Sequence, residues 1–131
     1  VALAFGDKQF LVLYQEQKKS YIRIFDLANC LKCAQDGNTP KVVCAIPGSS
    51  DFEYTYCVWG PLNKSIFVST DKGRVIQIDT TTGKVIKEKT VHMNEIFKLH
   101  ITHDYTMLMT CSRDGYVKLL HPETFEEVRK Y

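Results

Sequence analysis

Apolar residues occur along this chain in short stretches that partly alternate with polar residues and are separated by turn residues. Stretches such as "SIFVST", "RVIQID" and "KVIKEK" are rich in β-branched side chains, which is typical of strands. Gly73 and Gly115 end the sequences "TDKG" and "SRDG", where glycine permits the positive φ that tight hairpin turns require. Because no segment of ten or more residues carries a clear helical stripe, the pattern predicts an all-β chain without a substantial helix.

The spacing of these stretches repeats along the chain. Aligning Gly73 with Gly115, which lie 42 residues apart, places apolar residues on apolar residues, as with Ile66 on Leu108. A weaker copy lies upstream, where Leu13 matches Ile66 at an offset of 53 because a longer connection intervenes. A period of about 40–45 residues is typical of propeller blades.

Each copy is predicted to contain four strands. The predicted strands span 1–5, 10–15, 20–27 and 41–47 in the first copy, 55–60, 65–70, 73–79 and 84–90 in the second, and 95–101, 106–111, 115–121 and 125–131 in the third. Residues 28–40, "ANCLKCAQDGNTP", are polar and contain Gly and Pro. They are therefore predicted to form a surface loop inserted between the last two strands of the first copy.

A four-stranded sheet of this size cannot cover both of its apolar faces, and stacking such sheets around an axis solves the problem. We therefore predict one partial propeller domain over residues 1–131, with blades roughly at 1–47, 55–90 and 95–131. Three blades do not close a ring, which usually takes about four to eight. The chain is thus expected to be a segment of a longer propeller; a stand-alone three-blade protein would have to oligomerise to cover its end sheets.

Composition narrows the partners and the compartment. A chain of 131 residues with 44% apolar content can build one core, and its net charge of +2 gives no global field that would favour nucleic acid or a membrane. No apolar run approaches the roughly 20 residues that span a bilayer. Five cysteines form no even framework, which fits a reducing compartment, cytosolic or nuclear.

The turn sequences resemble the WD40 repeat family. "STDKGRVIQID" and "CSRDGYVKLLH" correspond to the Ser-x-Asp-Gly turn of that family followed by an apolar strand. The usual Trp-Asp dipeptide is present only as Phe-Asp at 25–26, Ile-Asp at 78–79 and Leu-His at 120–121, and the Gly-His dipeptide is reduced to His92. The resemblance implies a WD40-type β-propeller with degenerate repeats.

A closer resemblance is to subunit i of eukaryotic translation initiation factor 3. It is carried by "VWGPL" at 58–62, "TTTGKV" at 80–85 and "NEIFKLHITHDYTMLMTCSRDGYVKL" at 94–119. The resemblance implies the middle blades of a seven-bladed ring in a cytoplasmic, non-enzymatic scaffold that supports mRNA recruitment to the small ribosomal subunit. It also implies protein partners, namely subunits b and g of the complex and, indirectly, the small ribosomal subunit, but no motif marks the contact residues.

Two other functions stay open from the sequence. One is a WD40 scaffold of another assembly, such as signalling or ubiquitin-ligase recruitment. The other is an enzyme whose active site lies at the mouth of the propeller. Co-purification with subunit b distinguishes the two scaffold hypotheses, and a screen for hydrolase turnover tests the third.

His92, Ser112 and Asp114 are the residues that most invite a functional reading. Together they suggest a hydrolase triad, which would need a base within hydrogen-bond reach of the serine and an oxyanion hole. The WD40 resemblance implies instead a structural His–Ser–Asp network that ties the entry loop of a blade to its hairpin turn. We favour the structural interpretation and predict no catalytic residue.

Three further motifs could suggest function but are better explained by structure. Cys30 and Cys33 in "CLKC" could begin a zinc site, but no second CxxC or HxxxH follows, so no metal site is predicted. "TTTGKV" lacks the flanking residues of a phosphate loop and is predicted to be a hairpin turn, so no cofactor is expected. Trp59 is predicted to be buried between blades, whereas Tyr54 and Tyr56 flank a connecting loop.

Overall fold

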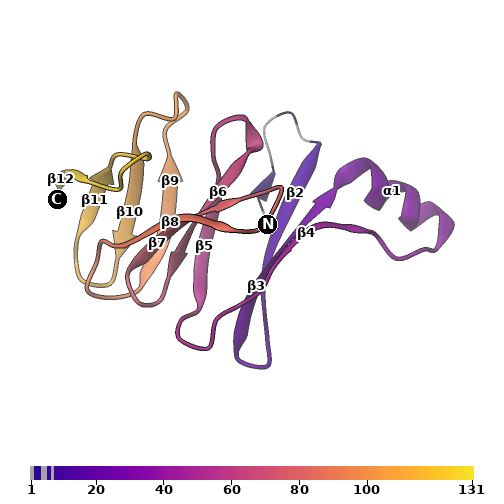
Figure 1. Ribbon diagram of the computed structural model, residues 1–131, viewed down its shortest axis with the longest axis horizontal. Helices are drawn as coiled ribbons and strands as arrows, with labels where there is room; N and C mark the ends of the chain where they lie inside the picture. The colour runs from indigo at the N-terminus through magenta and orange to yellow at the C-terminus, as the bar shows by residue number, and fades with distance from the viewer. Residues whose placement is uncertain (1, 4–5, 7) are drawn as a thin grey trace.

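Short strands form three separate four-stranded antiparallel sheets, which stand side by side (Figure 1). The computed structural model describes residues 2, 3, 6 and 8–131. The first sheet contains β1 (Ala2–Leu3), β2 (Gln9–Glu16), β3 (Lys19–Asp26) and β4 (Val42–Ile46). The middle sheet contains β5 (Tyr54–Trp59), β6 (Ser65–Thr70), β7 (Arg74–Asp79) and β8 (Val85–Thr90). The third sheet contains β9 (Ile96–Ile101), β10 (Leu108–Ser112), β11 (Val117–Leu120) and β12 (Glu127–Lys130).

The predicted all-β class and four strands per copy are confirmed, and the sheets follow chain order without crossovers. For the first predicted strand, 1–5, only residues 2 and 3 carry a described strand, and residues 1, 4 and 5 lie outside the described part. Each hairpin places neighbouring strands in antiparallel register, as in Ile66 opposite Ile78. A short 3-10 turn, η1 (Pro61–Asn63), connects β5 to β6.

The repeat extends to the backbone hydrogen bonds that close the loops. The amide of Asp71 donates to the carbonyl of Glu53 at 3.0 Å, and the amide of Arg113 donates to that of Glu95 at 2.9 Å. Donor and acceptor both shift by the same offset of 42, since 113 − 71 = 95 − 53 = 42. The second and third copies therefore share the same loop geometry, although most of their residues differ.

The prediction of a surface loop at 28–40, and with it that of a chain without a substantial helix, is wrong, because α1 (Leu27–Asp36) occupies most of this segment. The side chain of Asp26 caps the start of the helix by accepting from the amide of Asn29 at 3.0 Å. Gly37 ends it with a φ of 74° and donates to the carbonyl of Cys33. The helix lies on the surface, as expected of the segment, and none of its residues is buried. A helical stripe is present in these ten residues, since Leu27, Cys30, Leu31 and Ala34 follow the i, i+3, i+4, i+7 spacing.

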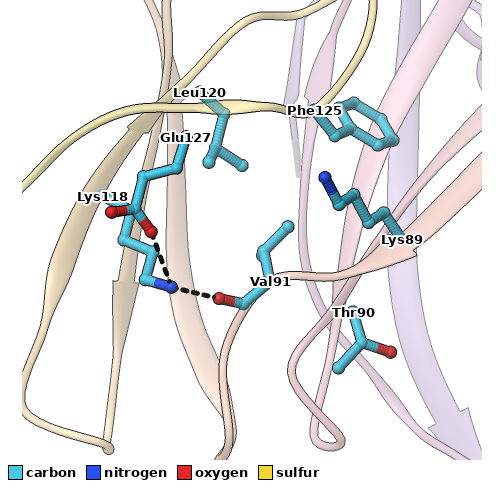
Figure 2. Close-up of a pocket in the computed structure, with 7 residues that line it drawn as sticks. All are labelled: Lys89, Thr90, Val91, Lys118, Leu120, Phe125 and Glu127. Carbon is cyan, nitrogen blue, oxygen red and sulfur yellow. Dashed lines mark hydrogen bonds and ion pairs between the residues drawn. The ribbon is translucent and has the colours of Figure 1, made fainter.

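The middle and third sheets pack through one apolar cluster. Its buried members are Phe67, Val75, Ile96, Leu99, Leu108, Leu120 and Phe125. The rings of Phe67 and Phe125 meet edge to face with centroids 6.0 Å apart. Towards the outer strands a small hollow of about 130 Å³ remains beside this cluster, where the ammonium group of Lys118 pairs with Glu127 and donates to the carbonyl of Val91 (Figure 2).

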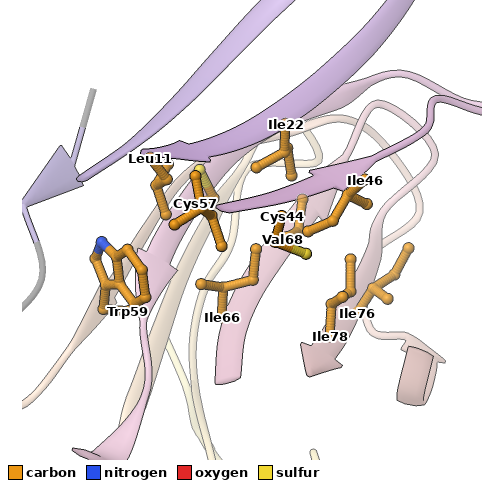
Figure 3. Close-up of a cluster of buried hydrophobic side chains, with 11 residues drawn as sticks. Leu11, Ile22, Cys44, Ile46, Cys57, Trp59, Ile66, Val68, Ile76 and Ile78 are labelled. Atoms are coloured by element: carbon orange, nitrogen blue, oxygen red, sulfur yellow. The ribbon is translucent and has the colours of Figure 1, made fainter. Parts of the chain in front are cut away.

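The first and middle sheets pack through a second, larger apolar cluster (Figure 3). Its buried members are Leu11, Ile22, Ile24, Cys44, Ile46, Cys57, Trp59, Ile66, Val68, Ile76 and Ile78. The predicted burial of Trp59 is confirmed, since only 7% of its surface is exposed. Tyr54 packs against this cluster and donates its hydroxyl to the carbonyl of Pro47, whereas Tyr56 is more exposed.

β6 shows how the middle sheet is covered on both faces. All six of its residues are buried. Ile66 and Val68 belong to the cluster with the first sheet, and Phe67 between them belongs to the cluster with the third. Because side chains alternate between the two faces of a strand, one strand joins both clusters. Full burial of each such apolar side chain contributes about 1.5–3 kcal/mol.

The faces of the first and third sheets that point away from the middle sheet are also apolar. On the first sheet Phe10 stacks on Phe25, and Tyr14 stacks on Tyr21, each pair with centroids 5.5 Å apart. On the third sheet, Met109 and Leu119 lie opposite each other, alternate with the inward residues of their strands, and are only partly buried. Side chains of this kind on a sheet face indicate a surface suited to packing rather than to water.

Candidate functional site: a buried histidine network

The loop that leads from β8 into β9 is held against the turn of the middle sheet. The amides of Val91 and His92 both donate to the carbonyl of Gly73, at 2.9 and 3.1 Å. Gly73 has a φ of 77°, and a Cβ at this position would lie 2.0 Å from the carbonyl oxygen of His92. Only glycine combines this conformation with so close an approach. The turn in "TDKG" thus fixes the position of the His92 backbone, from which the imidazole extends.

The side chain of His92 is fully buried and has a partner at each ring nitrogen. Its Nδ1 lies 2.8 Å from Oδ2 of Asp114, and its Nε2 lies 2.7 Å from Oγ1 of Thr110. A carboxylate can only accept, so we assign a proton to Nδ1. The hydroxyl of Thr110 lies within hydrogen-bond distance of Nε2 and, at 3.4 Å, of the carbonyl of Lys118. The imidazole therefore joins the turn after β10 to the middle of that strand.

Asp114 collects several donors at the turn between β10 and β11. Besides His92, the amide of Met93 donates to Oδ2 at 3.2 Å and the amide of Tyr116 donates to Oδ1 at 3.0 Å. Burial by itself would raise the pKa of this carboxyl group, but the hydrogen bonds from His92, Tyr116 and Met93 outweigh it and hold the pKa below its ordinary value. The carboxylate is thus the shared acceptor of the entry loop and the hairpin turn.

Ser112 occupies a different place from the one that the motif suggests. Its hydroxyl donates to the carbonyl of Asn94 at 3.2 Å and accepts from the amide of Asp114 at 3.2 Å. Ser112 is the last residue of β10 and lies level with the loop, and the extra residue of the register shift beside it is on β9. Thr110, two residues earlier on the same side of β10, takes the imidazole nitrogen instead.

His92 and Asp114 are therefore brought together, Ser112 is joined to them through the amide of Asp114, and Thr110 is the member that sequence reasoning missed. The available signal was the alternation of β10, which places Thr110 on the inner face with Leu108. Leu120, at the position of the usual Trp, lies in the apolar cluster.

The hydrogen bonds of this network hold parts of the backbone together, and the geometry does not suit catalysis. A general base must reach a substrate, directly or through one water. The side chain of His92 has no exposed surface, and the hydroxyl of Ser112 is directed at a backbone carbonyl rather than at the imidazole. What the geometry does is connect the entry loop, the strand and the turn through charge-assisted hydrogen bonds, which are stronger than neutral ones.

The other sequence candidates lie elsewhere. Cys30 and Cys33 are free thiols on α1. Among the described residues, no three His, Cys, Asp or Glu side chains gather as a metal site would need. "TTTGKV" forms the predicted hairpin turn, in which Gly83 has a φ of 72° and the carboxylate of Asp79 accepts from the amides of Thr81 and Thr82. In the described part of the chain no helix has the length and apolarity to cross a membrane.

Comparison with known proteins gives a consistent set of relatives, although no protein-family model matches the chain. Subunit I of eukaryotic translation initiation factor 3 from Dictyostelium discoideum is 32% identical over 130 residues, which is 96% of this chain and 37% of that protein. The subunit I from Homo sapiens is 28% identical over 113 residues, 85% of this chain and 33% of that protein. The one from Bombyx mori is 32% identical over 82 residues, 63% of this chain and 25% of that protein. The chain thus spans about a third of the length of the first two of these relatives.

Proposed function

Because its curated homologues are subunit I of eukaryotic translation initiation factor 3, we propose that this chain is part of a non-enzymatic scaffold subunit of that complex. The homology covers most of the chain, including all three sheets. The observation that carries the proposal is this homology together with sheets that repeat at the offset seen in the sequence.

The three sheets are proposed to be consecutive blades of a seven-bladed WD40 propeller, at roughly 1–47, 55–90 and 95–131. The middle sheet supports this, since each of its faces packs on one neighbour. The apolar outer faces of the first and third sheets support it too, because a ring would cover both with further blades.

The network of His92, Thr110, Ser112 and Asp114 has a structural role in this proposal. It would lock the loop that enters the third blade to the hairpin turn of the same blade. A rigid blade entry keeps the loops of a propeller in place, and those loops are where such scaffolds present binding surface. The role is therefore positional.

The proposed partners are subunits b and g of the initiation-factor complex and, through them, the small ribosomal subunit during mRNA recruitment. The proposed place of action is the cytoplasm. These assignments follow from resemblance, and the near-neutral charge of the chain agrees with protein rather than nucleic-acid contacts.

The test is to tag the protein that carries this chain in its own cells and to identify what co-purifies with it by mass spectrometry. We expect subunits b and g among the enriched proteins, at amounts comparable to the tagged protein. An untagged strain is the control for background. Recovery of a folded tagged protein with a signalling or ubiquitin-ligase assembly, and with no initiation-factor subunit, would establish the alternative scaffold instead.

A further inference from the structure

The five free cysteines lie in three kinds of surroundings. Cys44 and Cys57 are buried in the cluster between the first and middle sheets. Burial raises the pKa of both thiols, that of Cys57 to about 12, so neither supplies much thiolate at neutral pH. Cys111 is partly exposed and lies alone on β10. Cys111 thus lies on a different sheet from the two buried cysteines.

Cys30 and Cys33 differ because they form a pair on an exposed element. Both are partly exposed, and they lie three residues apart on α1, which has no buried residue. Residues three apart face the same side of a helix. The thiol of Cys33 is directed at the carboxamide oxygen of Asn29 at 3.8 Å, which is a weak interaction that exchange would easily disrupt.

The spacing in an intact helix comes close to that of a disulfide without meeting it. Ideal helix geometry places the Cα atoms of such a pair roughly 5 Å apart, within the range of about 4.4–6.8 Å that disulfides use. The Cβ atoms lie about 5–6 Å apart in a helix, whereas a disulfide needs roughly 3.5–4.5 Å. The bond can therefore close only if this turn of α1 changes shape.

α1 is anchored at its first turn and weakly held at its last. The amide of Leu27 donates to the carbonyl of Lys8, and the side chain of Asn29 accepts from the amide of Lys41. At the other end, the amides of Gly37 and Asn38 both donate to the carbonyl of Cys33. Moving Cys33 therefore removes the cap on which the last turn depends. Helices of this length gain little stability by themselves, so the distortion costs little.

We propose that Cys30 and Cys33 form a dithiol site that exchanges with low-molecular-weight disulfides such as oxidised glutathione, and that closing it unwinds the last turn of α1. One thiolate attacks a sulfur of oxidised glutathione, forms a mixed disulfide and releases one glutathione thiolate. The second cysteine thiolate then attacks the cysteine sulfur of the mixed disulfide and releases the second glutathione thiolate. In sum two cysteine thiols lose two protons and two electrons, and one oxidised glutathione becomes two reduced molecules. The site is independent of the scaffold function proposed above.

The experiment is to equilibrate the chain with mixtures of reduced and oxidised glutathione and to measure intact mass, disulfide-linked peptides and amide hydrogen exchange. We expect the oxidised chain to lose the mass of two hydrogen atoms, with the link mapped to the peptide containing Cys30 and Cys33. Exchange at the amides of Gly37 and Asn38 should become faster, while that of β6 stays unchanged. Cys30→Ser and Cys33→Ser should each retain one glutathione on the remaining thiol of α1.

Cys111→Ser is the matched control, and we expect it to form the same disulfide as the wild-type chain. Conditions that attach glutathione to Cys30→Ser and Cys33→Ser should close the disulfide in the wild-type chain. The proposal is overturned if the wild-type chain then keeps five thiols or carries only glutathione adducts. A link to another cysteine would also overturn it. A closed disulfide without faster exchange at the last turn would contradict the unwinding.

Discussion

The two interfaces between the sheets use the same backbone frame and different chemistry. The interface of the first and middle sheets contains 11 buried side chains of the apolar cluster, against seven between the middle and third sheets. The smaller interface is accompanied by the His92 network. At the offset of 42, Ser50 stands where the third copy has His92, and Lys72 stands where it has Asp114. The network thus belongs to the third copy and not to the second.

Both entry loops are held by directed hydrogen bonds, since the carboxylate of Asp71 accepts from the amide of Glu53 in the middle sheet, but only the third sheet adds a buried imidazole. Apolar contacts are non-directional and scale with area, so the larger cluster tolerates turns of varied sequence. A buried polar network works only when each member has its partner. We therefore expect the first interface to lose stability gradually with lost volume and the second to respond sharply to single polar changes.

The largest effect is expected from Phe125→Ala. Phe125 is almost fully buried against Phe67 and has a φ of 59°, so its ring holds a turn that most residues would avoid. Removing a buried phenyl ring costs about 3–5 kcal/mol of unfolding free energy, which urea denaturation would measure. Phe97→Ala, on a half-exposed ring of the same sheet, is the control and should change it by less than about 0.5 kcal/mol. Equal losses in both variants would contradict the assigned packing.

Gly73→Ala comes next and has a close control in Gly115→Ala. Both glycines have positive φ, 77° and 92°. A methyl group at Gly73 meets the carbonyl of His92, whereas one at Gly115 meets nothing within 4 Å. We expect Gly115→Ala to cost about 1 kcal/mol from backbone strain alone and Gly73→Ala roughly 2–3 kcal/mol. Thermal unfolding of both variants would show whether the close approach exists.

Asp114→Ala should cost about 1–3 kcal/mol, because it leaves the imidazole of His92 and the amides of Met93 and Tyr116 without their acceptor. Lys72→Ala, at the equivalent place in the middle sheet, should be near neutral, since this side chain is mostly exposed. The melting temperatures of the two variants give the comparison. An unchanged melting temperature for Asp114→Ala would refute the network's contribution.

The pH dependence should separate the wild-type chain from Asp114→Asn. The pKa of Asp114 lies below its ordinary value of 3.8 in the folded state. Its hydrogen bonds therefore stabilise the fold above about pH 4, and this stabilisation is lost as the pH falls through the folded pKa. The difference in unfolding free energy between the two proteins should shrink between neutral pH and pH values below about 4. The depressed pKa values of Asp79 and Asp104 act in both proteins and cancel in that difference. A constant difference across this range would contradict the assignment.

The smallest expected effect is a coupling energy, which tests which hydroxyl belongs to the network. Double-mutant cycles would compare the coupling of His92 to Thr110 with that of His92 to Ser112. We expect a coupling of about 0.5–1 kcal/mol or more for Thr110, which touches the imidazole, and a smaller one for Ser112, which does not. The variants Thr110→Val and Ser112→Ala keep the shape of the strand. A larger coupling for Ser112 than for Thr110 would support the His–Ser–Asp network expected from the motif and contradict the contact described here.

The strands were predictable because period and turn residues are written directly in the sequence. Ile66, Phe67 and Val68 show why, since a run of apolar residues bounded by turns fits a strand buried on both faces. α1 was missed because the Gly and Pro that follow it made the whole of 28–40 look like a loop, although Leu27, Cys30, Leu31 and Ala34 have helical spacing and Asp26 and Gly37 are suitable caps.

The site was predictable only in part. His92 and Asp114 could be paired by resemblance, but alternation places both Thr110 and Ser112 on the inner face of β10, and only the structure shows which hydroxyl reaches the imidazole. Nothing local in "MLMTCSRDG" decides between the two hydroxyls. Alternation could have placed Thr110 on the inner face, but its contact with the imidazole emerged from the structure.

The central claim is that the middle sheet is covered on both faces, and hydrogen exchange of individual amides, followed by NMR, tests it most directly. β6 is buried at every position, whereas β12 is exposed at all four of its residues. We predict that the amides of Ser65–Thr70 exchange slowest in the chain, with protection equal to global unfolding. Exchange in β6 as fast as in β12 would show that the sheets do not pack as described.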